Sequence, residues 1–228
     1  MPRTARQAPG GTVFHVLNRG VGRMRLFEKD GDYEAFERVL IETLSLRPMR
    51  LLAYCVMPNH WHMVVWPRED GHLAAFMQRL SITHARRWQE HRHLVGTGHI
   101  YQGRYKSFPV QTDAHFLTVC RYVERNPLRA NLVKRAEAWR WSSLGRRRRR
   151  AAQTRELLSD WPVDRSARWT ARVNAAETAE ELDPLRLSVA RGKPFGNPTW
   201  TQRTIARLGL ESSIRPRGRP RKRPHDKE

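Results

Sequence analysis

RLLAYCVMPNHWHMVVW, residues 50–66, is strongly patterned and predicts the centre of the fold. Both of its ends are apolar, and the pair Pro58 and Asn59 between them is typical of a tight turn. Two apolar runs joined by such a turn predict an antiparallel hairpin, with strands over residues 50–57 and 60–66.

The segments on both sides of this hairpin add strands and helices. Residues 12–19 alternate apolar and polar side chains, and residues 105–110 form a short run before a turn, so both predict strands. Residues 29–46 and 71–92 have apolar side chains at helical spacing. The resulting β-α-β-β-α-β order is the split βαβ pattern of the ferredoxin-like fold, which is an α+β class with an antiparallel sheet and helices on one face.

A further helix is expected over residues 112–126. Pro127 should end it, because proline lacks an amide proton and disfavours helical conformation in the residue before it. The sheet face that the first two helices leave uncovered, or a strand edge, is where we expect a site.

The composition changes after residue 144 and divides the chain into three parts. Residues 1–144 contain all predicted strands and form the main domain. Residues 145–211 are largely polar and predict a partly helical C-terminal extension. It begins with the run Arg146 to Arg150, which we expect to contact phosphates. Residues 212–228 are rich in Pro, Arg and Lys and predict a disordered basic tail.

The charge of the chain indicates a polyanionic partner. Lys and Arg outnumber Asp and Glu by 43 to 22, which gives a formal net charge of +21. Most of the basic residues are Arg, whose guanidinium suits bidentate phosphate contact, so nucleic acid is favoured. A membrane partner is disfavoured, since no basic amphipathic helix and no span of sufficient length stands out. Eight Trp residues disfavour a ribosomal structural role.

Cysteine usage and the N-terminal residues indicate the compartment. Cys55 and Cys120 form no CxxC pair and lie in apolar runs, so we expect buried thiols and no structural zinc site. Residues 1–11 lack the apolar core of a signal peptide. The sequence therefore predicts a cytoplasmic, nucleoid-associated protein.

His60 and His62 are the first candidates for chemistry. They are separated by one residue on a predicted strand, so both rings point to the same face, with Cα atoms about 7 Å apart. At this spacing two ring nitrogens can reach one cation. The alternative is a pair of histidines on a solvated sheet face, and the HxH pattern alone does not separate the two hypotheses. The other histidines are scattered and are interpreted as non-ligands.

Tyr122 is the candidate nucleophile. Asn126 follows it by four residues and therefore lies on the same face of the predicted helix. A tyrosine beside a metal can attack phosphorus, and the Asn126 amide oxygen can supply a third metal ligand. The alternative is that Tyr122 is an ordinary core residue. Tyr101 and Tyr105 are rival nucleophiles, although their loop and strand positions give them no comparable ligand partner.

Several stretches of the chain together resemble one family. The most specific combination is PNHWH (58–62) with YVERNP (122–127). The matching stretches are FHVLNRG (14–20), YCVMPNHWHMVV (54–65), YQGRYKSFPV (101–110), CRYVERNPLRANLV (120–133), WRWSSL (139–144), RGKPFG (191–196) and LGLESSIRPRGRPRK (208–222). They resemble the REP-associated tyrosine transposases, a branch of the IS200-like, single-tyrosine HUH transposase superfamily, over nearly the whole chain.

The resemblance implies a role for each candidate residue. His60 and His62 match the histidine pair of the superfamily, Tyr122 matches the nucleophile, and Asn126 matches a third ligand that is Gln in related insertion-sequence enzymes. Residues 1–144 would be the catalytic domain. The implied metal is Mg²⁺ or Mn²⁺, and two imidazoles favour Mn²⁺.

The resemblance also implies an activity and a partner. The activity is that of a metal-dependent DNA transposase, a site-specific nickase and strand transferase that works as a monomer. The implied substrate is single-stranded DNA with palindromic repeat hairpins, cut through a 5′-phosphotyrosine intermediate that leaves a free 3′-hydroxyl.

Basic residues outside the candidate site are expected to contact DNA. Arg104 and Lys106 lie in the matching stretch 101–110. In the tail, the sequence RGRP (217–220) resembles the core of an AT-hook, which enters the narrow A·T minor groove. The alternative is a basic tail that adds only phosphate affinity. The expected DNA contacts in the tail are Arg217, Arg219 and Lys222.

Two other classes of function stay open. A non-cleaving regulator or architectural protein would bind repeat DNA without cutting it, and the joint presence of His60, His62, Tyr122 and Asn126 disfavours this. An RNA-binding ferredoxin-like module would require exposed aromatic side chains on the central strands in place of the histidines.

Overall fold

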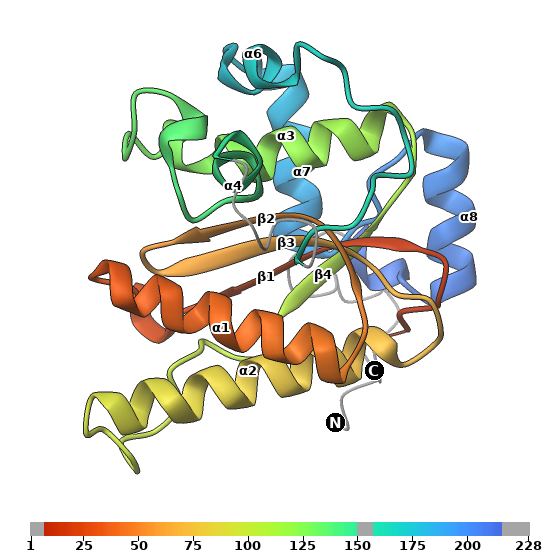
Figure 1. The fold of residues 1–228 in the computed structure, drawn as a ribbon. Coiled ribbons are helices and arrows are strands. Elements are labelled where there is room, and N and C mark those ends of the chain that lie inside the picture. The colour runs from red at the N-terminus through yellow and green to blue at the C-terminus, as the bar shows by residue number, and fades with distance from the viewer. Residues whose placement is uncertain (1–6, 150–156, 216–228) are drawn as a thin grey trace, which may run out of the picture.

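A four-stranded antiparallel sheet lies at the centre of the chain, in the order β2-β3-β1-β4 (Figure 1). The computed structural model describes residues 7–149 and 157–215. Every neighbouring pair of strands is antiparallel, which confirms the predicted ferredoxin-like α+β class. The strands are β1 (Val13–Arg19), β2 (Arg50–Met57), β3 (His60–Trp66) and β4 (Lys106–Val110).

The helices lie between these strands and after the last of them. Within the described residues, none of them is long and apolar enough to cross a membrane. The α-helices are α1 (Asp30–Leu46), α2 (His72–His91), α3 (Ala114–Arg129), α4 (Ser143–Arg148), α6 (Trp169–Asn174), α7 (Ala179–Arg191) and α8 (Pro198–Leu208). The 3₁₀ turns are η1 (Val21–Arg23), η2 (Ala136–Ala138) and η3 (Glu211–Ser213).

The predicted hairpin forms between β2 and β3 with the predicted bounds. Met57 pairs with His60 next to the turn, and on the other side of β3 Leu17 of β1 lies opposite His62. β3 therefore has a hydrogen-bonded neighbour on each side. This double pairing fixes the direction in which the two histidines point.

Helices cover both faces of the sheet (Figure 1). α1 and α2 pack on one face, over a core that includes Trp61, Met63 and Val65. α3 packs on the opposite face, over Val64 and Phe108. Because side chains alternate along β3, the two candidate histidines point toward α3. The face that α1 and α2 leave uncovered does carry the candidate site, but α3 covers it.

α3 continues past Pro127 and ends at Arg129, so the prediction that it ends at Asn126 is wrong. A proline inside a helix removes one hydrogen bond and crowds the carbonyl four residues earlier. Here the loss falls in the last turn, where the Ala130 N–H still donates to the Asn126 carbonyl at 2.9 Å. The added residues bring Arg129 to the side of the helix that carries Tyr122 and Asn126.

The segment after α4 returns to the sheet and packs on α3 and β4. α6 lies against α3, and α7 lies against β4. Phe195 forms a parallel bridge with Val110, and its N–H donates to the Pro109 carbonyl at 2.9 Å. The C-terminal extension thus covers the sheet edge beside β4, and residues 216–228 of the predicted tail lie outside the described residues.

The arginine run is partly structural, so the prediction that it contacts phosphates is wrong for its first two members. Arg146 is buried and pairs with a carboxylate of α1, and Arg147 donates to the buried Glu124 carboxylate at 2.8 Å. These pairs form because an unpaired buried charge is costly. The exposed members of the run are Arg148 and Arg149, and residue 150 lies outside the described residues.

His84 on α2 makes the stability of the fold sensitive to acid. Its ring contacts Phe27 and Phe36, and its Nδ1 lies 2.7 Å from the Tyr101 hydroxyl. Burial lowers the pKa of His84 from 6.5 to about 3. Between these two values the unfolded chain binds a proton that the folded chain excludes. The free energy of unfolding must therefore fall as the pH falls below 6.5.

His84→Gln should remove this contribution. We expect the loss of unfolding free energy on acidification to shrink by up to about 1.4 kcal/mol per pH unit, since one proton is no longer taken up on unfolding. Urea unfolding at a series of pH values measures the slope. His91→Gln, at an exposed histidine of the same helix, is the control. An unchanged slope in His84→Gln would contradict the assignment.

Candidate active site

β3 places the two candidate metal ligands side by side, on the sheet face that α3 covers. The ring centroids of His60 and His62 lie 5.0 Å apart. His60 Nδ1 lies 2.6 Å from the Asn59 side-chain oxygen, and His62 Nδ1 lies 2.9 Å from His15 Nε2. Because protein partners engage both Nδ1 atoms, Nε2 is the atom through which each ring can bind a cation. This arrangement is typical of metal-binding histidines.

The surroundings keep both rings neutral. Burial, followed by the charges of Arg19 and Arg129, lowers the pKa of His60 from 6.5 to about 4. Burial, followed by the neighbouring His60 and His15, holds the pKa of His62 well below 6.5. A neutral imidazole keeps the lone pair that a metal ion requires, so both rings are in the metal-binding form at neutral pH.

His15 on β1 orients His62, a role that the sequence analysis missed. The His15 ring is fully buried against Phe108, and its Nδ1 has no hydrogen-bond partner within the described part of the chain. The alternation of residues 12–19 predicts that His15 and Leu17 share a face. Only the register of β1 against β3 sets His15 beside His62, and the sequence gives no signal for that register.

α3 brings Tyr122 to the same place. Its ring centroid lies 5.8 Å from that of His62 and 6.4 Å from that of His15. Asn126 follows one turn later and is buried. The guanidinium carbon of Arg129 lies 4.1 Å from the Tyr122 ring centroid, and Arg129 Nη2 donates to the Asn126 side-chain oxygen at 3.1 Å. Tyr122 is thus in ring contact with His62, and Arg129 contacts both Tyr122 and Asn126.

Two imidazoles and one amide oxygen are the donor groups that this site could offer to a divalent cation. Among the residues that the structure describes, no three His, Cys, Asp or Glu side chains gather to hold a metal ion. A third protein ligand would therefore be of another type, and Asn126 is available. Its Nδ2 is buried without a hydrogen-bond partner in the described chain, and its oxygen has a second lone pair beside the one that faces Arg129.

A cavity of about 450 Å³, here called the tyrosine cavity, opens beside Tyr122. Its lining includes Arg104 and Lys106, two of the residues expected to contact DNA. Arg19 and Arg186 also line it, and the sequence pattern predicts neither of them as a DNA contact. Four cationic side chains around one tyrosine suit an anionic polymer. The other expected contacts, Arg217, Arg219 and Lys222, lie outside the described residues.

A second cavity of about 1210 Å³ lies between α2 and the loop that precedes β4. It shares Asn18, Gly103 and Arg104 with the tyrosine cavity. Its other lining residues include the exposed apolar side chains of Ile82 and Val95. A single strand has apolar base faces beside a charged backbone. An apolar cavity next to a cationic one therefore suits unpaired bases in the first and phosphates in the second.

The rival tyrosines lie elsewhere. Tyr101 packs in the core on the α1 and α2 side, where its hydroxyl meets His84 Nδ1 and accepts from Trp61 Nε1 at 3.1 Å. Burial raises the pKa of Tyr101 above its usual value of 10.0. Tyr105 packs against the same core and lines the larger cavity. Tyr122, by contrast, is in ring contact with His62.

Two known proteins are similar to this chain, one in sequence and one in fold. A REP-associated tyrosine transposase of Escherichia coli (strain K12) is 24% identical over 141 residues, which cover 60% of this chain and 78% of the relative. A solved structure of a REP-associated tyrosine transposase bound to a REP hairpin matches with a TM-score of 0.53 and 21% identity, over 73% of this chain and 96% of that one. This second likeness shows that the fold is shared.

A family model agrees with both relatives. The model of IS200-like transposases matches residues 11–126, just over half of the chain. The matched range contains β1, the hairpin with His60 and His62, and α3 as far as Asn126. The chain therefore belongs to the IS200-like transposase family.

Proposed function

We propose that this transposase-family protein is a metal-dependent, site-specific nickase and strand transferase that cuts single-stranded DNA at palindromic repeat hairpins. The observation that carries the proposal is the position of Tyr122, whose ring lies beside His62 and in the wall of the cationic tyrosine cavity. Phosphodiester cleavage requires a nucleophile and a place for the charged backbone at one point, and this site offers both.

Tyr122 would act as the nucleophile. Its phenol oxygen forms a bond to phosphorus, the bond from phosphorus to the 3′ oxygen breaks, and the tyrosine stays joined to the 5′ phosphate. The phenol loses its proton, and the leaving 3′ oxygen takes one up as the free hydroxyl. Because the tyrosine ester conserves the bond energy, a 3′-hydroxyl can later attack it and rejoin a strand without ATP.

His60, His62 and Asn126 would hold Mg²⁺ or Mn²⁺. When bound, the ion supplies Lewis-acid polarisation of the scissile phosphate. The protein contributes two neutral imidazoles, one fixed by Asn59 and the other by His15. Two nitrogen ligands favour Mn²⁺ over Mg²⁺.

Hairpin DNA is the proposed substrate because a structure of similar fold contains a REP hairpin. Arg19, Arg104, Lys106 and Arg186 would hold the strand's phosphates beside Tyr122. The larger cavity would receive unpaired bases. We propose that the protein acts as a monomer on nucleoid DNA, and that the tail residues Arg217, Arg219 and Lys222 add affinity.

Labelled single strands test this proposal. We expect a covalent protein–DNA adduct, stable in a denaturing gel, with strands that carry a repeat hairpin from the flanking genome. An unstructured strand of the same composition should bind at least about tenfold more weakly, since it lacks the stem, whose backbone would add phosphate contacts to those that the strand makes in the tyrosine cavity. Equal affinity for both strands would contradict the hairpin preference. Tight hairpin binding without any adduct would favour the non-cleaving regulator.

A further inference from the structure

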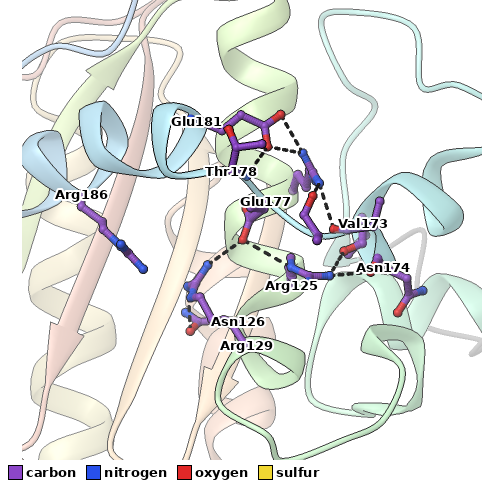
Figure 2. A network of polar contacts seen from close by, with 12 residues as sticks. Arg125, Asn126, Arg129, Val173, Asn174, Glu177, Thr178, Glu181 and Arg186 are labelled. Carbon is purple, nitrogen blue, oxygen red and sulfur yellow. Dashed lines mark hydrogen bonds and ion pairs between the residues drawn. The ribbon is translucent and has the colours of Figure 1, made fainter.

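Three arginines of α3 tie the nucleophile helix to the C-terminal extension. Arg121, Arg125 and Arg129 recur every four residues and therefore lie on one side of the helix. All three contact the segment that joins α6 to α7. Figure 2 shows Arg125 and Arg129 with their partner Glu177. The model of the family ends at residue 126, so neither Arg129 nor this segment belongs to the matched range.

Glu177 lies between two of these arginines. Its side chain is only 5% exposed, and its Oε2 lies 3.4 Å from Arg125 Nε and 3.3 Å from Arg129 Nη1. Figure 2 shows both guanidinium groups directed at this one carboxylate. Without its charge, two partly buried cations would face each other uncompensated.

Arg129 connects Glu177 to the candidate active site. While Nη1 faces Glu177, Nη2 donates to the Asn126 oxygen and the guanidinium lies over the Tyr122 ring. The guanidinium is planar and rigid, so fixing one edge fixes the other edge and the face together. The position of Glu177 therefore determines where Arg129 meets both Tyr122 and Asn126.

We propose that Glu177 and Arg129 are positioning residues of the cleavage reaction, and that the C-terminal extension thereby completes the active site. The proposal rests on the proposed function of Tyr122. Arg129 restricts the tyrosine ring and the Asn126 amide to one orientation, and Glu177 keeps Arg129 from turning toward solvent or toward the incoming phosphates. The segment between α6 and α7 would then act on the rate of cleavage and not on DNA affinity.

Glu181 provides a matched control. It lies in the first turn of α7, four residues after Glu177, and pairs with Arg121 of α3, with both carboxylate oxygens 3.0 Å from Arg121 Nη1. Neither residue has a described contact with Tyr122 or Asn126. Glu181→Gln also keeps the helix cap with Thr178, because Gln serves at this capping position as Glu does.

Single-turnover adduct formation separates positioning from a purely structural role. At saturating hairpin DNA, Glu177→Gln should slow adduct formation about tenfold, because small misplacement of a reacting group carries losses of this order. Its Kd for the hairpin should stay within about twofold of wild type, and Glu181→Gln should leave both quantities within about twofold. Equal effects of the two variants on the rate would overturn the proposal.

Arg129→Lys is the second variant, and it keeps the charge but loses the planar face and the second donor edge. It should slow the reaction about as much as Glu177→Gln, and the double variant should be no slower than either single one, since both changes remove the same contact. Additive losses would mean that Glu177 does not act through Arg129.

Tyrosine NMR gives a readout that needs no cleavage. In protein labelled at the tyrosine ζ-carbon, the Tyr122 signal, assigned with Tyr122→Phe, should shift in Glu177→Gln and stay in place in Glu181→Gln. If wild type forms no adduct, the proposed function fails while this spectrum still tests the positioning. If wild type forms the adduct and the Tyr122 signal of Glu177→Gln does not move, the positioning role of Glu177 is refuted while the proposed function stands.

Discussion

Tyr122→Phe should lower formation of the covalent protein–DNA adduct by at least about a thousandfold, because the loss of a nucleophile removes the reaction path itself. Phenylalanine keeps the ring, its contact with the Arg129 guanidinium and its edge contact with His62. Affinity for hairpin DNA should therefore stay within about twofold of wild type. Denaturing gels measure the adduct, and equilibrium binding to the same labelled hairpin measures the affinity.

Tyr101→Phe is the matched control for this experiment. Tyr101 is also a buried tyrosine, but it lies on the opposite face of the sheet and bonds to Trp61 and His84. Its loss should lower stability and leave the adduct intact. If Tyr122→Phe still forms the adduct while Tyr101→Phe or Tyr105→Phe does not, the nucleophile has been assigned to the wrong residue.

The fold was predictable where the signals are local. The apolar runs on both sides of Pro58 and Asn59 predict the β2–β3 hairpin with its observed bounds. Alternation along β3 then places His60 and His62 on one face, as observed. Helical periodicity places Tyr122 and Asn126 on one side of α3 in the same way. Each of these predictions depends on neighbours within one turn or one strand.

The end of α3 shows where a local signal misleads. Proline is a strong signal for the end of a helix, yet the helix that carries Tyr122 runs through Pro127. The cost of one missing hydrogen bond in the last turn is offset by the contacts of the residues that follow. Arg129 is one of them, and it meets Glu177, which lies 48 positions further along the chain. A pattern read along a single segment contains no information about such a partner.

The remaining parts of the site are non-local in the same sense. His15 meets His62 across a strand register, over 47 positions of sequence. Arg186 reaches the tyrosine cavity from α7, in an extension whose composition predicted only partial helix. The chemistry-bearing residue types were recognisable from spacing and resemblance, whereas the residues that orient them follow from tertiary packing.

The two histidines give the second large effect. His60→Ala and His62→Ala should each lower adduct formation by at least about a hundredfold, since either change leaves an open site with one imidazole too few for tight binding. Excess chelator should abolish the activity of wild type, and Mn²⁺ or Mg²⁺ should restore it. Binding of Mn²⁺ alone, followed by electron paramagnetic resonance, should weaken more than about tenfold in each variant.

His115→Ala is the control for these variants, because it removes a histidine near the site that is not a proposed metal ligand. His115 lies on α3, like Tyr122, but its ring contacts Asp113 and Phe195 and not the histidine pair. It should bind Mn²⁺ and form the adduct as wild type does.

The two ligand variants should still bind hairpin DNA, because the cations that line the tyrosine cavity are unchanged. Full activity of wild type in excess chelator would remove the metal from the mechanism. His60 could not then donate to the phosphate as a neutral ring, because its single N–H, on Nδ1, is committed to the Asn59 oxygen and its Nε2 carries only a lone pair.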